Sequence, residues 1–187
     1  CADLIQKAPD VLEYQIKSAQ ILFYQGEFDQ TDAKLHEIVD QLPMDNYSVN
    51  DILDVMAVLI GFRHNQEEFV DFAKVQLNIQ QNKRTEALEK LETLFDTNEI
   101  YIADMCRYQH AWLTFLQGDA ELTKKQLSKI ENETIFKELA HIFQAEILDF
   151  IDKDISNAID SYLDFLGLYP QSIYYDDVRL RLRELAS

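Results

Sequence analysis

Glycine and proline are scarce in this sequence, which contains four glycines and three prolines in 187 residues. A β-sandwich or β-barrel needs a turn signal about every ten residues, and a chain so short of turn-forming residues cannot provide them. A disordered acidic tail is also excluded, because 47% of the residues are hydrophobic and 11% are aromatic. The length is that of one domain with a sizeable core.

Cysteine, long hydrophobic runs and positive charge are equally limited. Two cysteines without a CxxC pair do not make a disulfide framework. The longest apolar run covers residues 55–62, whereas a membrane-spanning helix needs roughly 20 residues, so we expect a protein that does not span a membrane. The formal net charge is −17, with 34 acidic and 17 basic residues. This charge disfavours nucleic acid and anionic membrane surfaces as partners, because both are polyanions.

Apolar residues recur at helical spacing along nearly the whole chain. The joints between these amphipathic segments are short, which favours antiparallel neighbouring helices, and no strand pattern of useful length competes with them. The sequence therefore predicts an all-α fold of about ten helices. Their expected ranges are 11–24, 28–41, 49–62, 66–81, 84–96, 100–116, 119–131, 135–151, 155–168 and 173–186.

A repeated pattern is the most informative feature of the sequence, and Pro9 and Pro43, which each follow a helical stretch, are 34 residues apart. Each unit has a first helix, a turn residue and a second helix with the spacing small-x3-large-x2-apolar. Small residues let two helices approach each other, and the large residues fill the space beside them. The clearest copies contain Ala19, Gly26, Phe28, Thr31, Leu35, Ile38 and Pro43, and Lys153, Ile155, Ala158, Tyr162, Phe165 and Pro170. Two weaker copies contain Asn82, Arg84, Ala87, Leu91, Leu94 and Glu99, and Ala111, Gly118, Ala120, Thr123, Leu127, Ile130 and Ile135.

This unit resembles the tetratricopeptide repeat (TPR). The resemblance implies an antiparallel helix-hairpin solenoid, a TPR-like α–α superhelix, that covers residues 1–187 as a single domain. The segment 169–174, with the arginines that follow it, is similar to the ending of bacterial envelope-associated TPR proteins. That similarity favours the bacterial periplasm or cell envelope over the cytoplasm. The three arginines in the segment 179–183 are expected to complement the dipole of the last helix.

Two features depart from a regular array. The interval from Gly26 to Asn82 is long enough for one additional helix, at about 49–62, and this is the most apolar segment of the chain. We expect it to be buried on most of its sides and to change the curvature of the solenoid. Leu4-x4-Pro9 repeats the ending of a second helix, which predicts that the chain is a fragment of a longer protein and that Cys1 is an internal helix position. The alternative is that Cys1 is the lipid-bearing first residue of a bacterial lipoprotein.

Motifs of the common enzyme classes are missing. The sequence contains no HExxH, Walker loop, GxSxG or GxGxxG, which disfavours zinc peptidases, nucleotide-binding enzymes and serine hydrolases. Cys106 and His110 share a helix face, but only His141 could join them as a metal ligand, so the cysteine is expected to be part of the core. The acidic segment 149–154 lacks the spacing of a calcium loop and is expected to be a solvated turn. Residues 132–134 form a glycosylation sequon, which matters only in a eukaryotic secretory context. We expect no metal, no cofactor and no small-molecule substrate.

A binding surface is the better functional candidate. In TPR proteins the first helix of each hairpin lines a concave groove that receives a peptide or another protein, and the resemblance transfers this role to the matching positions here. The lysine–asparagine clamp with which some members hold a C-terminal carboxylate is absent from them. The expected partner-binding residues are Gln20, Tyr24, Phe72, Gln76, Gln80, Tyr108, Trp112 and Phe115.

Three functions remain open at this point. The leading hypothesis is a non-enzymatic protein–protein interaction scaffold, whose groove of glutamines and aromatics in an acidic frame would suit an extended segment with apolar and basic residues. Trp112 is the only tryptophan, and a partly exposed Trp–Tyr pair is a common binding hot spot. The alternative is a purely structural spacer or buttress, in which the same aromatics pack against the next repeat. The third is an enzyme that uses Cys106 and His110.

Overall fold

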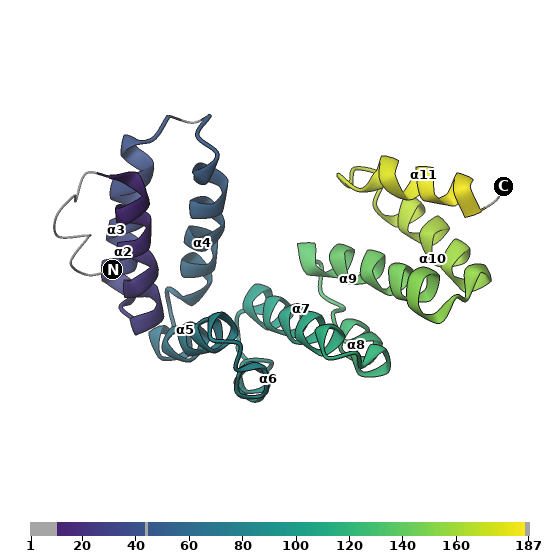
Figure 1. Ribbon diagram of the computed structural model, residues 1–187, viewed down its shortest axis with the longest axis horizontal. Helices are drawn as coiled ribbons and strands as arrows, with labels where there is room; N and C mark the ends of the chain where they lie inside the picture. Colours follow the sequence, from purple (N-terminus) through teal and green to yellow (C-terminus); the bar gives the residue numbers. More distant parts are fainter. Residues whose placement is uncertain (1–10, 44, 186–187) are drawn as a thin grey trace. The chain divides into compact units, whose positions relative to one another are not determined.

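The computed structural model describes residues 11–43 and 45–185, and this part of the chain contains helices and turns but no strand (Figure 1). The predicted all-α fold class is confirmed, and most helix bounds lie within a few residues of those expected. Leu4, Pro9 and Cys1 lie outside the described residues. The helices are α2 (Leu12–Gln25), α3 (Phe28–Gln41), α4 (Ser48–Phe62), α5 (Gln66–Gln80), α6 (Arg84–Thr93), α7 (Ile100–Leu116), α8 (Ala120–Leu127), α9 (Ile135–Glu146), the π-helix η1 (Ile147–Asp152), α10 (Ile155–Leu168) and α11 (Tyr175–Leu185).

The chain divides into two compact units between Ile102 and Ala103, near the start of α7. In unit 1, α2 pairs with α3 and α5 pairs with α6, while α2 also contacts α5. In unit 2, α9 contacts α8 and α10, and α10 contacts α11 (Figure 1). Sequential helices therefore pack as neighbours in both units, as the short joints predict. No helix within the described ranges combines the length and the apolar character needed to cross a bilayer.

The turn positions of the sequence repeat share one backbone conformation. Gly26 and Gly118 have φ values of 76° and 87°, and the non-glycine residues at the equivalent turns, Asn82 and Lys153, have φ values of 58° and 57°. This left-handed conformation ends a helix and reverses the chain, because the N–H groups beyond it reach back to the last free carbonyls. The N–H of Gly26 bonds the carbonyl oxygens of Leu22 and Phe23 in this way. The sequence repeat thus corresponds to a repeated helix hairpin.

Small residues of the repeat are buried where the two helices of each hairpin approach. These are Ala19, Ala87, Ala111 and Ala158, and the large residues that follow in each second helix are also buried. The large residues are Leu35, Leu91, Leu127 and Tyr162. Both observations agree with the packing that the repeat pattern predicts.

The core of unit 1 is a cluster of phenylalanines around Phe69. The ring centroid of Phe69 lies 5.2 Å from that of Phe23, 5.3 Å from that of Phe28 and 5.8 Å from that of Phe62, each with edge-to-face geometry. Such pairs add to the stabilisation from buried area. Phe62 comes from the additional helix α4, so this helix supplies part of the core between α3 and α5, both of which it contacts.

Helix α4 buries only one of its faces, which corrects the expectation that it is buried on most sides. Phe62 is buried, whereas Leu53 and Ile60 are 42% and 61% exposed. Gly61 allows a close approach on the buried side, because a Cβ at this position would lie 2.6 Å from Cδ1 of Ile102. The uninterrupted apolar run 55–62 therefore did not show whether this helix is buried on one face or on most of its sides.

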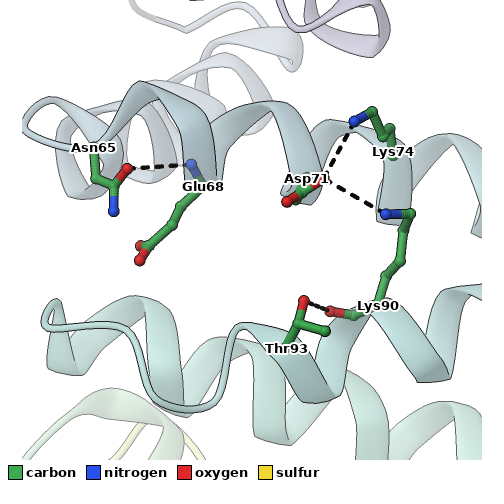
Figure 2. A network of polar contacts seen from close by, with 6 residues as sticks. All are labelled: Asn65, Glu68, Asp71, Lys74, Lys90 and Thr93. Atoms are coloured by element: carbon green, nitrogen blue, oxygen red, sulfur yellow. Dashed lines mark hydrogen bonds and ion pairs between the residues drawn. The ribbon is translucent and has the colours of Figure 1, made fainter.

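Polar contacts connect the α5–α6 hairpin on its surface (Figure 2). The side chain of Asn65 caps α5 by accepting a hydrogen bond of 3.3 Å from the N–H of Glu68. Asp71 on α5 lies 3.2 Å from Nζ of Lys74 and 3.5 Å from Nζ of Lys90 on α6. Exposed ion pairs of this kind contribute at most about 1 kcal/mol each, so the hairpin depends mainly on its apolar interface.

The core of unit 2 forms on two sides of α9. One cluster joins α7, α8 and α9, and the other joins α9, α10 and α11. The first contains Ala111, Leu127, Ile130, Ala140, Phe143 and Ile147. The second contains Ala145, Ala158, Tyr162, Phe165 and Val178.

Helix α9 continues into the π-helix η1, where the sequence predicts one regular helix to residue 151. A π-helical turn adds a residue relative to an α-helical turn and so changes which side chains point inward. Here it places the carboxylate of Asp149 in the interior of unit 2. The π-helix ends at Lys153, and the N–H of Asp154 bonds the carbonyl oxygen of Leu148.

Candidate protein-binding surfaces

Three of the expected binding residues in unit 1 line one open pocket. Gln20 and Tyr24 of α2 and Gln80 of α5 surround a volume of about 300 Å³, together with Lys17 and Ile21. The residues of α2 recur at helical spacing and therefore share a face. Nζ of Lys17 donates a hydrogen bond of 3.0 Å to Oε1 of Gln20. The pocket thus combines an apolar side chain, two amides, a phenol and one cation.

The other two expected residues of unit 1 do not line this pocket. Phe72 is only 2% exposed, and its ring centroid lies 5.2 Å from that of Phe62 and 6.2 Å from that of Phe23. Phe72 is therefore a core residue in the described structure and offers no surface to a partner. Gln76, one turn further along α5, is half-buried.

Sequence reasoning missed two residues of the pocket, Lys17 and Ile21. Both lie on α2 within one turn of Gln20, so the spacing of this helix held the signal for them. The repeat pattern identified only one residue in each helical turn and therefore did not include the residues beside it.

In unit 2, the three expected residues lie together on α7 beside α9. Trp112 is 47% exposed, and its ring stacks on Phe115 with centroids 6.0 Å apart. Trp112 also lies 5.7 Å from the buried ring of Phe143, and Phe115 lies 5.2 Å from it. Tyr108 lies 5.8 Å from Phe136 and 6.2 Å from Phe143. The structure therefore brings the three together over one buried phenylalanine of α9.

Tyr108 interacts electrostatically with further polar groups of unit 2. Partial burial raises the pKa of Tyr108, and Tyr174 and the negative charge of Glu146 raise it further. Glu146 is the last residue of α9, and Tyr174 lies just before α11. A carboxylate and two phenols thus lie near one another beside the aromatic cluster.

Asp149 is a buried, hydrogen-bonded carboxylate of unit 2, and it is not the solvated residue that the sequence predicted. Its side chain is 1% exposed. Its Oδ2 accepts a hydrogen bond of 2.7 Å from Nε of Arg181, and its Oδ1 accepts one of 2.9 Å from Nη2. The hydroxyl of Tyr162 donates a third hydrogen bond, of 3.2 Å. The Arg181 guanidinium also lies 4.7 Å from the ring centroid of Phe150. Arg181 therefore joins α11 to η1, beyond the expected interaction with the helix dipole.

The two carboxyl groups at this end of α9 have opposite pKa shifts. The Arg181 guanidinium lowers the pKa of Asp149. Desolvation raises the pKa of Glu146, and the negative charge of Asp149 raises it further. The difference arises because Asp149 has a cation beside it, whereas in residues 11–43 and 45–185 no side chain forms an ion pair or hydrogen bond with the Glu146 carboxylate.

No protein-family model, curated protein or solved structure matches this chain.

The residues weighed for metal binding do not form a cluster. Cys106 and His110 are buried, and Nδ1 of His110 lies 3.3 Å from Oγ1 of Thr114. His141 lies on α9 with its ring 5.9 Å from that of Phe165, and burial lowers its pKa. Among the described residues, no three histidine, cysteine or acidic side chains are arranged to hold a metal ion.

The glycosylation sequon has a structural role in unit 2. Nδ2 of Asn132 donates a hydrogen bond of 3.0 Å to Oδ1 of Asp104, and the hydroxyl of Thr134 donates one of 2.9 Å to Oδ2. Asp104 is fully buried, so these two bonds satisfy a carboxylate that would otherwise be costly to bury. The pairing accounts for both residues without a glycan.

Proposed function

We propose that this chain is a non-enzymatic, TPR-like helical-repeat module that binds a partner protein or an extended peptide. The proposed surfaces are the pocket between α2 and α5 in unit 1, and the aromatic surface of α7 and α9 in unit 2. As a scaffold, the module would hold partners by side-chain burial and hydrogen bonds, with no chemical step of its own.

Trp112 is the observation that carries this proposal. A tryptophan that is 47% exposed leaves a large apolar ring in water, although its neighbours Phe115 and Phe143 hold it in a defined position. A pre-positioned ring loses little conformational entropy when a partner covers it, and tryptophan is enriched among the residues that dominate binding energy. The surface therefore has the properties of an anchor site.

The pocket of unit 1 supports the same function by different chemistry. The amides of Gln20 and Gln80 and the hydroxyl of Tyr24 line it. Such groups can hydrogen-bond the N–H and C=O groups of an extended backbone, which carries both donors and acceptors. Ile21 offers an apolar contact in the same pocket.

A structural spacer is the second candidate, and the burial of Phe72 favours it for unit 1. One expected binding residue there belongs to the phenylalanine core. A pure spacer would use its aromatic residues in this way throughout. The exposed position of Trp112 is the observation that distinguishes unit 2 from that expectation.

The test is selection of peptides from a random library displayed on phage, followed by affinity measurements on the purified chain. We expect the Trp112→Ala variant to bind selected peptides at least about tenfold more weakly, since a hot-spot truncation costs about 2 kcal/mol or more. Leu163→Ala is the matched control, because Leu163 is an exposed apolar residue of α10 in the same unit. Circular dichroism would show that both variants keep their helices. Equal affinity of the Trp112→Ala variant and the wild type would exclude the α7–α9 surface as the binding site.

A further inference from the structure

Unit 2 already binds one guanidinium within its own structure. Arg181 lies against a carboxylate and an aromatic ring at once, since it forms two hydrogen bonds with Asp149 and lies 4.7 Å from the centroid of Phe150. A planar guanidinium suits this arrangement, because its N–H groups form paired bonds with a carboxylate while its face stacks on a ring. Asp149 and Phe150 are neighbours in η1.

A carboxylate and aromatic rings also occur one turn earlier in the chain, but no described cation pairs with that carboxylate. Glu146 precedes Asp149 by about one helical turn at the end of α9, and no described residue forms an ion pair with it. Phe143 lies one turn before Glu146, and the exposed ring of Trp112 lies 5.7 Å from that of Phe143. The ring of Tyr108 lies 6.2 Å from that of Phe143, and the negative charge of Glu146 helps to raise the pKa of Tyr108.

From this arrangement we infer that Glu146 and the ring of Trp112 bind an arginine side chain of the partner. The inference rests on the proposed function and specifies the chemistry of the bound segment at the α7–α9 surface. The carboxylate of Glu146 pairs with the guanidinium, and the ring of Trp112 covers its face or its aliphatic stem. The partner is thus a peptide segment with an arginine next to apolar residues.

Charge favours this occupant over an acidic or a purely apolar one. The chain carries a formal charge of −17, which attracts cationic segments and accelerates their association. Glu146 also gains from a bound cation, because desolvation and the nearby Asp149 both disfavour its charged form and no described cation pairs with it. An acidic residue at the same place would add a third negative group.

The site can be tested with a pair of synthetic peptides that differ in one group. The first is a blocked hexapeptide of alternating leucine and arginine, and the second replaces each arginine with citrulline, which keeps the shape of the side chain and removes its charge. Trp112 is the only tryptophan of the chain, so its fluorescence reports binding at this surface directly. We expect the arginine peptide to bind at least about tenfold more tightly than the citrulline peptide, and we expect this preference to decrease as salt screens the pairing.

Variants of the full chain test whether Glu146 causes the preference for the arginine peptide over the citrulline peptide. Glu146→Gln keeps the size of the side chain and removes its charge, and it should abolish most of the preference for arginine. Asp160→Asn is the matched control, because Asp160 is an exposed acidic residue of α10 in the same unit, and it should leave the preference unchanged. Thermal unfolding followed by circular dichroism verifies that both variants are folded.

The outcomes separate this inference from the proposed function. Equal affinities for the arginine and citrulline peptides, or a preference that survives in Glu146→Gln, would overturn the inference. The proposed function would stand in either case if library-selected peptides still depended on Trp112. Loss of the Trp112 dependence for all peptides would instead overturn both.

Discussion

The two units place the same repeat positions in different environments. Counted from the turn residue of each hairpin, one position recurs in successive first helices. It is occupied by Gln20 and Gln76 in unit 1 and by Trp112 in unit 2. The unit 1 surface is a pocket lined by a lysine, two amides, a phenol and an isoleucine, whereas the unit 2 surface is a half-exposed ring that packs on Phe115 and Phe143.

The additional helix explains part of this difference. Helix α4 inserts Phe62 among the rings of unit 1, where it packs on Phe69 and Phe72. Phe72, which lies on the first helix of the second hairpin, is thereby part of the core. Unit 2 has no comparable insertion among its described helices, and its aromatic residues reach the surface of α7. One inserted helix can thus bury an aromatic ring of a first helix without changing the repeat pattern.

The largest expected effect comes from removing the central ring of unit 1. Phe69→Ala should lower the free energy of unfolding by about 3–5 kcal/mol, because it deletes a buried ring and leaves a cavity among the other phenylalanines. Urea denaturation followed by circular dichroism measures this loss. The fluorescence of Trp112 reports the unfolding of unit 2. If Phe69→Ala changes the free energy of unfolding of unit 2 much less than that of unit 1, the comparison between the units is sharpened.

Ile60→Ala is the control for that experiment. Ile60 lies on the exposed face of α4, so its truncation should cost less than about 1 kcal/mol. A loss similar to that of Phe69→Ala would contradict the view that α4 buries only one face.

The second effect concerns the Asp149–Arg181 pair of unit 2. Asp149→Asn should destabilise the chain by about 3 kcal/mol, because it leaves the guanidinium and the Tyr162 hydroxyl without their buried charged partner. Thermal or urea unfolding measures the loss. Asp160→Asn, at an exposed position of α10, should change stability by less than about 0.5 kcal/mol.

The same pair predicts a pH dependence. The pKa of Asp149 is lower in the folded chain than in the unfolded chain, so its stabilisation is complete above the unfolded pKa, about 3.9. This stabilisation is lost as the pH falls through the folded pKa, because the carboxylate must then take up a proton. The difference in stability between the wild type and Asp149→Asn should therefore narrow below about pH 4. A constant difference between pH 7 and pH 3 would contradict the assignment.

The smallest effect compares the turns of the two hairpins in unit 1. Gly26→Ala should cost about 1–2 kcal/mol, since alanine is strained at a φ of 76° and its Cβ would lie 3.1 Å from Cγ2 of Val70. Asn82→Gly should instead stabilise the chain by a few tenths of a kcal/mol up to about 1 kcal/mol, because glycine adopts the left-handed conformation without strain. Chemical denaturation of both variants checks the opposite signs.

The helices and their turns were accessible from the sequence because local rules determine them. Apolar periodicity predicts the all-α fold, and the repeat locates the turn residues Gly26, Asn82, Gly118 and Lys153, all of which have positive φ values. The small residues of the repeat predicted where helices approach. These features depend on residues a few positions apart, and sequence patterns describe such neighbours well.

The candidate binding surfaces were harder to predict from the sequence. The repeat pattern placed both Phe72 and Trp112 among the expected binding residues, but Phe72 is buried and Trp112 is not. The acidic segment 149–154 has the composition of a solvated turn, and only a π-helical turn and Arg181, from another helix, make Asp149 a buried centre. Neither partner of this pair predicts the other, because they lie 32 residues apart in the chain.

The sequence by itself thus determined the helices, the hairpin turns and the small residues at the crossing points, since periodicity and backbone preference act over short distances. The tertiary structure alone decided which aromatic rings stay exposed and which carboxylates have a cation beside them. Burial and charge pairing depend on side chains that distant helices bring together. The proposed arginine site is of this second kind, because it needs Trp112 from α7 and Glu146 from α9.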